Sequence, residues 1–324
     1  MKIFTILGLA LMLAACTQLQ PVPPVHITVD GPTTAQALNA RYADTRQNCG
    51  TPSIPAFLCS GVVLRATAYS TAYDPWDASP TAQARDGVSF SYLRKDSKFG
   101  QLVFSQTNGF IFYPIFDMPP DKVKLEVFCS FVIDGWTNNR PDHGCGAYPG
   151  YPVSQLCHSS NILTAADWQN HYRAVGGVSQ SLCGFNVRDS ANDHAGPSFY
   201  QSLLAKSTGS LASTLFVQQN EIIIKSWTDD TDGRLPIQAF FYLNNSATGL
   251  AEAKDIKRRF LAKTGIDLPL IQVTLPQTAS ADARFDYVAA DNRREQVTST
   301  PVRPAPRTQV PESGRCPSGL APCA

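Results

Sequence analysis

The stretch VQQNEIIIKSW, residues 217–227, contains the clearest strand of the sequence. Its three consecutive β-branched residues, Ile222–Ile224, are typical of a buried strand. Four amide or carboxylate side chains, at positions 218–221, stand directly before them. Such groups lose hydration on burial unless something hydrogen-bonds them, and a bound ligand is one source of those hydrogen bonds.

Apolar and alternating segments predict further strands on both sides of this one. They cover residues 61–70, 87–95, 108–116, 122–133, 237–243 and 270–275. In the second of these segments, one face is expected to carry Val88, Phe90 and Tyr92, and the other Ser89, Ser91 and Leu93.

Helix signals are interspersed with these strands. Thr164 stands three residues before Asp167, as in a capping box, and residues 196–209 have proline near the start and glycine at the end. The helix predicted over residues 250–263 is expected to bury Ala251, Ile256, Phe260 and Leu261 and to stop at Gly265. The sequence therefore predicts an α+β fold with mixed, mostly antiparallel strands and several packed helices.

The N-terminal segment MKIFTILGLALMLAAC, residues 1–16, is too short to span a bilayer and has the character of an export signal. Residues 13–16 resemble the lipobox of bacterial lipoproteins, so we expect a signal peptide over residues 1–15 and lipid on Cys16. A plain secretory signal is the alternative. Thr17 replaces the aspartate that often retains lipoproteins at the inner membrane, so the expected location is the outer membrane or the extracellular medium, with membrane contact through the lipid.

Composition divides the remaining chain into three parts. Residues 16–45 are rich in proline and small polar residues and are predicted to be a tether, and residues 46–290 to be the folded domain. Residues 291–324 are proline-rich and polar, which predicts a mostly disordered tail. The sequence has 27 basic and 26 acidic residues, and this balance gives no reason to expect nucleic-acid binding.

Nine cysteines are present, and eight remain when Cys16 is set aside for lipid. An even number in an exported chain predicts disulfides, although sequence alone does not fix their pairing. Their spacing favours neighbours in the chain: Cys49–Cys59, Cys129–Cys145, Cys157–Cys183 and Cys316–Cys323. There is no C-x-x-C pair and the histidines are scattered, so no metal is expected, and a histidine-based hydrolase is the weaker alternative.

Three polar motifs stand on the predicted strands: Arg65 ends an apolar run, Ser89-Phe90-Ser91 lies on an alternating strand, and Gln219-Asn220-Glu221 precedes the isoleucines. In this order they resemble the arginine, serine and glutamate signature of ADP-ribosyltransferase toxins. Compared with that family, the spacing of 24 residues from Arg65 to Ser89 is short, and the spacing of 130 residues from Ser91 to Glu221 is long. An ADP-ribosyltransferase-like core would therefore carry residues 129–209 as an insertion.

These residue types suit cleavage of the nicotinamide–ribose bond of NAD, which passes through an oxocarbenium-like state. Glu221 would stabilise the positive charge, and Ser89 would hold that glutamate and the ligand. Arg65 would bind phosphate oxygens, with Ser91 as a second NAD-binding residue. In the toxin family, the position of Gln219 helps to select the acceptor.

A broader set of segments resembles the halovibrin family of secreted bacterial proteins: PAFLCSGVVLRAT, GVSFSYLRKDSKF, NGFIFYP, CGFNVRDS, FVQQNEIIIKSW and LPIQAFFYL. The similarity covers residues 47–290. It implies an exported enzyme that consumes NAD as substrate, by hydrolysis or by ADP-ribose transfer to a protein acceptor. Hydrolysis is favoured because the sequence indicates no protein target. The alternative is a non-enzymatic surface lipoprotein that binds a partner or a glycan.

Overall fold

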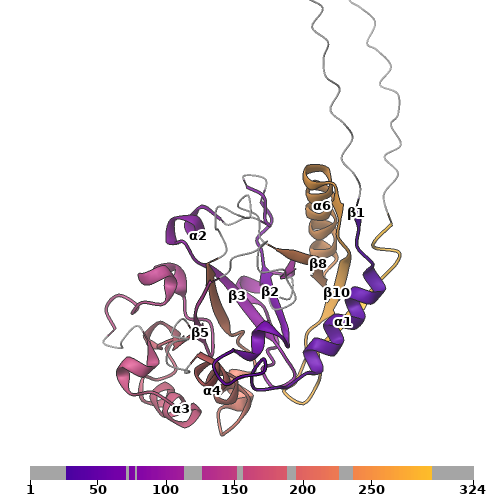
Figure 1. Cartoon of the computed structure of the whole chain (residues 1–324). Helices are drawn as coiled ribbons and strands as arrows, with labels where there is room; N and C mark the ends of the chain where they lie inside the picture. Colours follow the sequence, from indigo (N-terminus) through magenta and orange to yellow (C-terminus); the bar gives the residue numbers. More distant parts are fainter. Residues whose placement is uncertain are drawn as a thin grey trace, which may run out of the picture. The chain divides into compact units, whose positions relative to one another are not determined.

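A nine-stranded mixed sheet forms the centre of the fold (Figure 1). The computed structural model describes residues 27–70, 73–76, 79–112, 126–151, 156–187, 195–225 and 236–293. The strands of this sheet, in chain order, are β2 (Val62–Ala66), β3 (Val88–Leu93), β4 (Asn108–Phe112), β5 (Glu126–Phe131), β6 (Phe185–Asn186), β7 (Glu221–Lys225), β8 (Ile237–Leu243), β10 (Leu270–Thr274) and β11 (Arg284–Tyr287).

Their order across the sheet is β11-β10-β8-β4-β2-β3-β7-β5-β6. Within this sheet only the β8–β10 pair is parallel, so the predicted mixed, mostly antiparallel α+β fold is confirmed for the described chain. The alternation predicted for β3 is confirmed too: Val88, Phe90 and Tyr92 join one core cluster, while Leu93 joins the cluster on the other face.

Helices cover both faces of this sheet. They are α1 (Gly31–Ala43), α2 (Pro80–Arg85), α3 (Ala165–Ala174), α4 (Ala195–Ser207), α5 (Ala212–Leu215) and α6 (Ala247–Thr264). Phe240 of β8 belongs to the core cluster beneath α6, and the next residue, Phe241, belongs to the cluster beneath α1. None of the helices in the described ranges combines the length and apolar character that a membrane span requires.

The predicted limits of the folded domain need correction at the N-terminal side. Helix α1 lies inside the stretch assigned to a tether, with Leu38 and Tyr42 buried against β10, β11 and their neighbours. Asp30 caps this helix by accepting a hydrogen bond from the Thr33 amide at 2.9 Å. Before it, β1 (Ile27–Thr28) pairs with β9 (Ile266–Asp267). The fold therefore begins by residue 27, and residues 1–26, with Cys16, lie outside the described ranges.

At the other end, the compact unit extends to Asn292, whose side-chain oxygen accepts a hydrogen bond from the Leu270 amide at 2.7 Å. Two residues more than predicted therefore belong to the domain. Residues 294–324, with Cys316 and Cys323, lie outside the described ranges.

We expect Leu38→Ala to lower the free energy of unfolding by about 2–5 kcal/mol, the usual range for removing a buried leucine side chain. Leu38 is 1% exposed and packs in the cluster between α1 and the sheet. Gln36→Ala, at an exposed position of the same helix, is the matched control. Chemical denaturation measures both; equal stability of the two variants would mean that α1 contributes no packing.

Helix α6 begins three residues earlier than predicted, capped by the Ser246 hydroxyl, and ends at Gly265 as expected. Its buried residues are Gly249, Ala253, Ile256 and Phe260. The predicted burial of Ala251 is wrong and Leu261 is only half-buried, because the helical spacing through Ile256 and Phe260 places both outside the buried stripe.

Three cysteine pairs lie at disulfide distance, and they are three of the predicted neighbours. The S–S distances are 2.14 Å for Cys49–Cys59, 2.05 Å for Cys129–Cys145 and 2.05 Å for Cys157–Cys183. The second pair ties β5 to the loop that follows it.

Candidate active site

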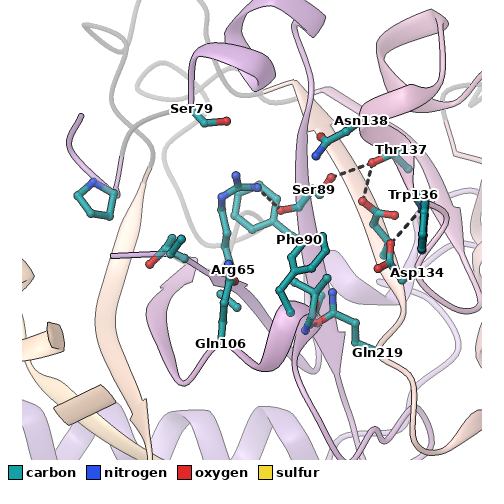
Figure 2. Close-up of a pocket in the computed structure, with 18 of the residues that line it drawn as sticks. Arg65, Ser79, Ser89, Phe90, Gln106, Asp134, Trp136, Thr137, Asn138 and Gln219 are labelled. Carbon is teal, nitrogen blue, oxygen red and sulfur yellow. Dashed lines mark hydrogen bonds between the residues drawn. The ribbon is translucent and has the colours of Figure 1, made fainter. Parts of the chain in front are cut away.

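The three predicted motifs lie on neighbouring strands, because β3 pairs with β2 on one side and with β7 on the other. All five predicted site residues, Arg65, Ser89, Ser91, Gln219 and Glu221, line one cavity of about 390 Å³ (Figure 2). We call it the Glu221 cavity. Arg65 and Glu221, which are 156 positions apart in the chain, thus line the same cavity.

Glu221 is 5% exposed, and both oxygens of its carboxylate have partners. The Thr137 hydroxyl donates to Oε1 at 2.6 Å, and the Gly135 amide donates to Oε2 at 2.9 Å. A Cβ atom on residue 135 would lie 2.7 Å from the ring of Phe131, so glycine permits this close approach of the backbone. The carboxylate is therefore held in one orientation by the loop after β5.

Ser89 contacts Glu221 through an intermediary rather than directly. Its hydroxyl lies 3.0 Å from the Thr137 hydroxyl, which in turn donates to the carboxylate (Figure 2). Thr137, and not Ser89, therefore contacts the glutamate directly, and a role of Ser89 in holding a ligand stays a prediction. Ser91 is buried, at 3% exposed, and lies deeper along the same strand.

Arginines surround the carboxylate. Arg65 donates from Nη1 to the Ser89 carbonyl at 2.6 Å, whereas its buried Nε has no hydrogen-bond partner among the described residues. Arg85, at the end of α2, donates to the Thr137 hydroxyl at 3.0 Å and to the Ser89 hydroxyl at 3.3 Å. Burial and the neighbouring Arg85 lower the pKa of Arg65 to about 10, which leaves it charged at neutral pH.

Arg140 fixes the loop that holds Glu221. Its buried guanidinium donates to the carbonyls of Gly135 at 2.7 Å, Gly146 at 3.0 Å and Leu182 at 2.7 Å. Burial lowers the pKa of Arg140 to about 10, and the charge of Glu221 acts in the opposite direction. The side chain thereby ties the loop to two segments that are themselves joined to the fold by disulfides.

A second carboxylate, Asp134, stands three residues after the end of β5. Its Oδ1 accepts a hydrogen bond from the Trp136 amide at 3.1 Å, and its own amide donates to the Gln219 carbonyl at 2.9 Å. Burial, followed by the charge of Glu221, raises the pKa of Asp134 to about 7. The site thus contains two carboxylates that interact electrostatically.

The polar cluster before β7 is satisfied largely by the protein. Asn220 accepts from the Tyr92 amide and donates to the Tyr92 carbonyl, both at 2.7 Å, and also donates to the Ser97 hydroxyl at 2.8 Å. Gln219 accepts from the Val103 amide at 3.0 Å. The hydrogen bonds that burial of this cluster requires therefore come from the chain itself, and Asn220 has a structural role.

Two aromatic side chains stand at the rim of the Glu221 cavity: Phe104 is 83% exposed and Trp136 is 48% exposed. Both have φ +52°, in the left-handed region that bulky residues rarely adopt. Such strain is concentrated at functional sites. Exposed flat rings at a cavity mouth can stack on the rings of a ligand.

Sequence reasoning missed Arg85, Asp134, Thr137 and the rim aromatics. They belong to turns and to a short helix, where no periodicity distinguishes a site residue from a surface residue. The one available signal is that Asp134-Gly135 directly follows an apolar strand. Among the described residues, no group of three histidine, cysteine, aspartate or glutamate side chains is placed to hold a metal ion.

The chain matches no protein-family model, and a search of curated proteins finds no significant match. The resemblance to halovibrins and to ADP-ribosyltransferase toxins therefore stays a prediction.

Proposed function

We propose that this protein cleaves the nicotinamide–ribose bond of NAD, with water as the favoured acceptor and a protein hydroxyl or amine as the other. The observation that carries the proposal is the ordered carboxylate of Glu221 in a cavity that also contains Arg65 and Ser89 from the two neighbouring strands. This is the arrangement that the resemblance to ADP-ribosyltransferase toxins implies, and an ADP-ribosyltransferase-like core is part of the proposal.

Glu221 supplies the charge that the reaction needs. As nicotinamide leaves, positive charge develops on the ribose at C1′, and a carboxylate in a shielded cavity stabilises it. The donors Gly135 and Thr137 fix both oxygens before substrate arrives, so little reorganisation is required. A carboxylate oxygen has more than one lone pair, so it can also accept a hydrogen bond from a ribose hydroxyl.

Arg65 supplies the phosphate contact. Its guanidinium lines the cavity and remains charged, and its buried Nε–H group has no acceptor within the described part of the chain. A diphosphate oxygen is an acceptor that would satisfy such a group. The rim rings of Phe104 and Trp136 can stack on nicotinamide or adenine.

Nicotinamide release from NAD by the purified protein with its disulfides formed tests the proposal. The expected result is multiple turnovers and accumulation of ADP-ribose. No turnover, together with no binding of NAD or ADP-ribose, would contradict it and would favour the non-enzymatic lipoprotein that binds a partner or a glycan. The protein used must retain residues 27–45, because helix α1 is part of the fold.

Arg65→Lys is expected to lower kcat/KM for NAD by about 10- to 100-fold, mainly through KM. A lysine loses the planar fork that contacts phosphate oxygens, and a hydrogen bond to a charged group contributes roughly 1.5–3 kcal/mol. Arg284→Lys, at an exposed position of β11, is the matched control. Steady-state kinetics check the prediction; an unchanged KM in Arg65→Lys would remove Arg65 from substrate binding.

A further inference from the structure

A second hollow, of about 260 Å³, adjoins the Glu221 cavity. We call it the side hollow. The two spaces share five lining residues: Val103, Phe104, Asp134, Trp136 and Gln219. Gln218 and Ser179 line the side hollow but not the Glu221 cavity. Asp134 therefore lies between the two spaces and can contact a molecule bound in either one.

We propose that Asp134 is the general base of the reaction: it takes the proton from the water that attacks C1′ of the ribose, and that water enters through the side hollow. This role rests on the proposed cleavage of NAD. The side hollow then serves as the acceptor site, and the polar side chains in its mixed wall, among them Ser179, Gln218 and Gln219, suit water or a small hydroxyl compound.

The bonds that break and form in the reaction show why a base is needed. The bond between C1′ and the pyridinium nitrogen breaks, and its electron pair stays with nicotinamide, which leaves as a neutral molecule without requiring a proton. A new bond forms between C1′ and the oxygen of water, which must lose a proton. That proton passes to the carboxylate of Asp134 and then to solvent.

Other polar groups that line one or both of the two spaces are less suited to this task. The amide of Gln219 has no basic site. Glu221 already receives hydrogen bonds from Thr137 and Gly135, and its negative charge is needed beside the ribose cation. Among the described residues that line the two spaces, the only carboxylates are Glu221 and Asp134.

The position and surroundings of Asp134 fit the role. Its amide donates to the Gln219 carbonyl and its Oδ1 accepts from the Trp136 amide, so the side chain is held at the junction (Figure 2). The charged groups that face it are Glu221 on β7 and Arg140 in the following loop. Burial and Glu221 raise its pKa to about 7, whereas Arg140 acts in the opposite direction. A base with a pKa near the working pH transfers protons efficiently.

The sign of the pH dependence follows from this assignment. As the pH rises through about 7, Asp134 loses its proton and becomes an ionised base. Wild-type NAD hydrolysis should therefore rise about 10-fold from pH 6 to pH 8, as expected for one ionisation with an apparent pKa near 7. Asp134→Asn should be flat over this range and about 10²-fold slower at pH 8.

The test compares pH–rate profiles of nicotinamide release for the wild-type protein, Asp134→Asn and the matched surface variant Asp286→Asn. Azide, an anionic nucleophile that has no proton to lose, should restore cleavage in Asp134→Asn with formation of ADP-ribosyl azide. If Asp134→Asn loses the rise in rate from pH 6 to pH 8 and azide restores its cleavage of NAD, both results would support the base role, because a purely structural defect produces neither.

The outcomes separate the two proposals. Wild-type cleavage of NAD with an unchanged profile in Asp134→Asn would overturn the role of Asp134 and leave the proposed function standing. A wild-type rate of cleavage that does not rise from pH 6 to pH 8 would also overturn the role of Asp134. This outcome needs no folded variant. No cleavage by the wild-type protein at any pH would overturn both.

Discussion

Glu221→Gln is expected to lower the rate of NAD cleavage by about 10²- to 10⁴-fold, the range found when a charge-stabilising catalytic group is removed. Glutamine has nearly the same shape. Its amide oxygen can still accept from Gly135, and its amide nitrogen can donate to the Thr137 hydroxyl. The fold and the binding of NAD should therefore persist, while the negative charge beside the ribose is lost. Single-turnover nicotinamide release and calorimetric binding measure the two effects separately.

Glu126→Gln is the matched control, because Glu126 is exposed at the start of β5. It should retain wild-type activity. Full activity in Glu221→Gln would exclude Glu221 from catalysis, whereas equal losses in the two variants would point to a general effect of removing carboxylates.

The second large effect is expected at the Cys129–Cys145 disulfide. Replacing both cysteines by alanine should lower the free energy of unfolding by about 3 kcal/mol, as estimated for a closed loop of about 15 residues. The loop between them contains Gly135, Thr137 and Arg140, which hold Glu221. NAD cleavage should also fall by about 10- to 100-fold at a temperature where the variant is folded, because small misplacements of reacting groups are costly.

The Cys49–Cys59 pair provides the control for this variant. Its sequence separation is 10 residues rather than 16, and no residue of the loop it closes lines the Glu221 cavity. Removing it should lower stability by about 2–3 kcal/mol without changing kcat at permissive temperature. Thermal unfolding with and without strong reductant gives the combined effect of the disulfides. Equal kinetics in the two double variants would mean that the β5 loop needs no disulfide to position Glu221.

Sequence patterns predicted the sheet well because its strands have strong local signals. The isoleucines of β7 and the alternation of β3 both report burial directly. Helix α1 was missed because Gly31-Pro32-Thr33-Thr34 resembles a loop, and because much of the helix consists of alanine and polar residues. Its burial depends on β10 and β11, which lie more than 200 residues away in the chain.

The candidate site was predictable where it lies on strands and not where it lies in turns. Arg65, Ser89 and Glu221 each stand in a recognisable strand context, so their order could be compared with a known signature. Asp134 and Thr137 contact the Glu221 region only because β5 pairs with β7. That pairing joins segments distant in sequence, and a local pattern contains no information about it.

The most direct test of the central claim is a crystal structure of Glu221→Gln with NAD bound at saturating concentration. We expect intact NAD in the Glu221 cavity, with the diphosphate on Arg65, C1′ of the nicotinamide ribose beside residue 221, and the side hollow open toward that carbon. An empty cavity at saturation, or NAD bound elsewhere on the protein, would contradict the account.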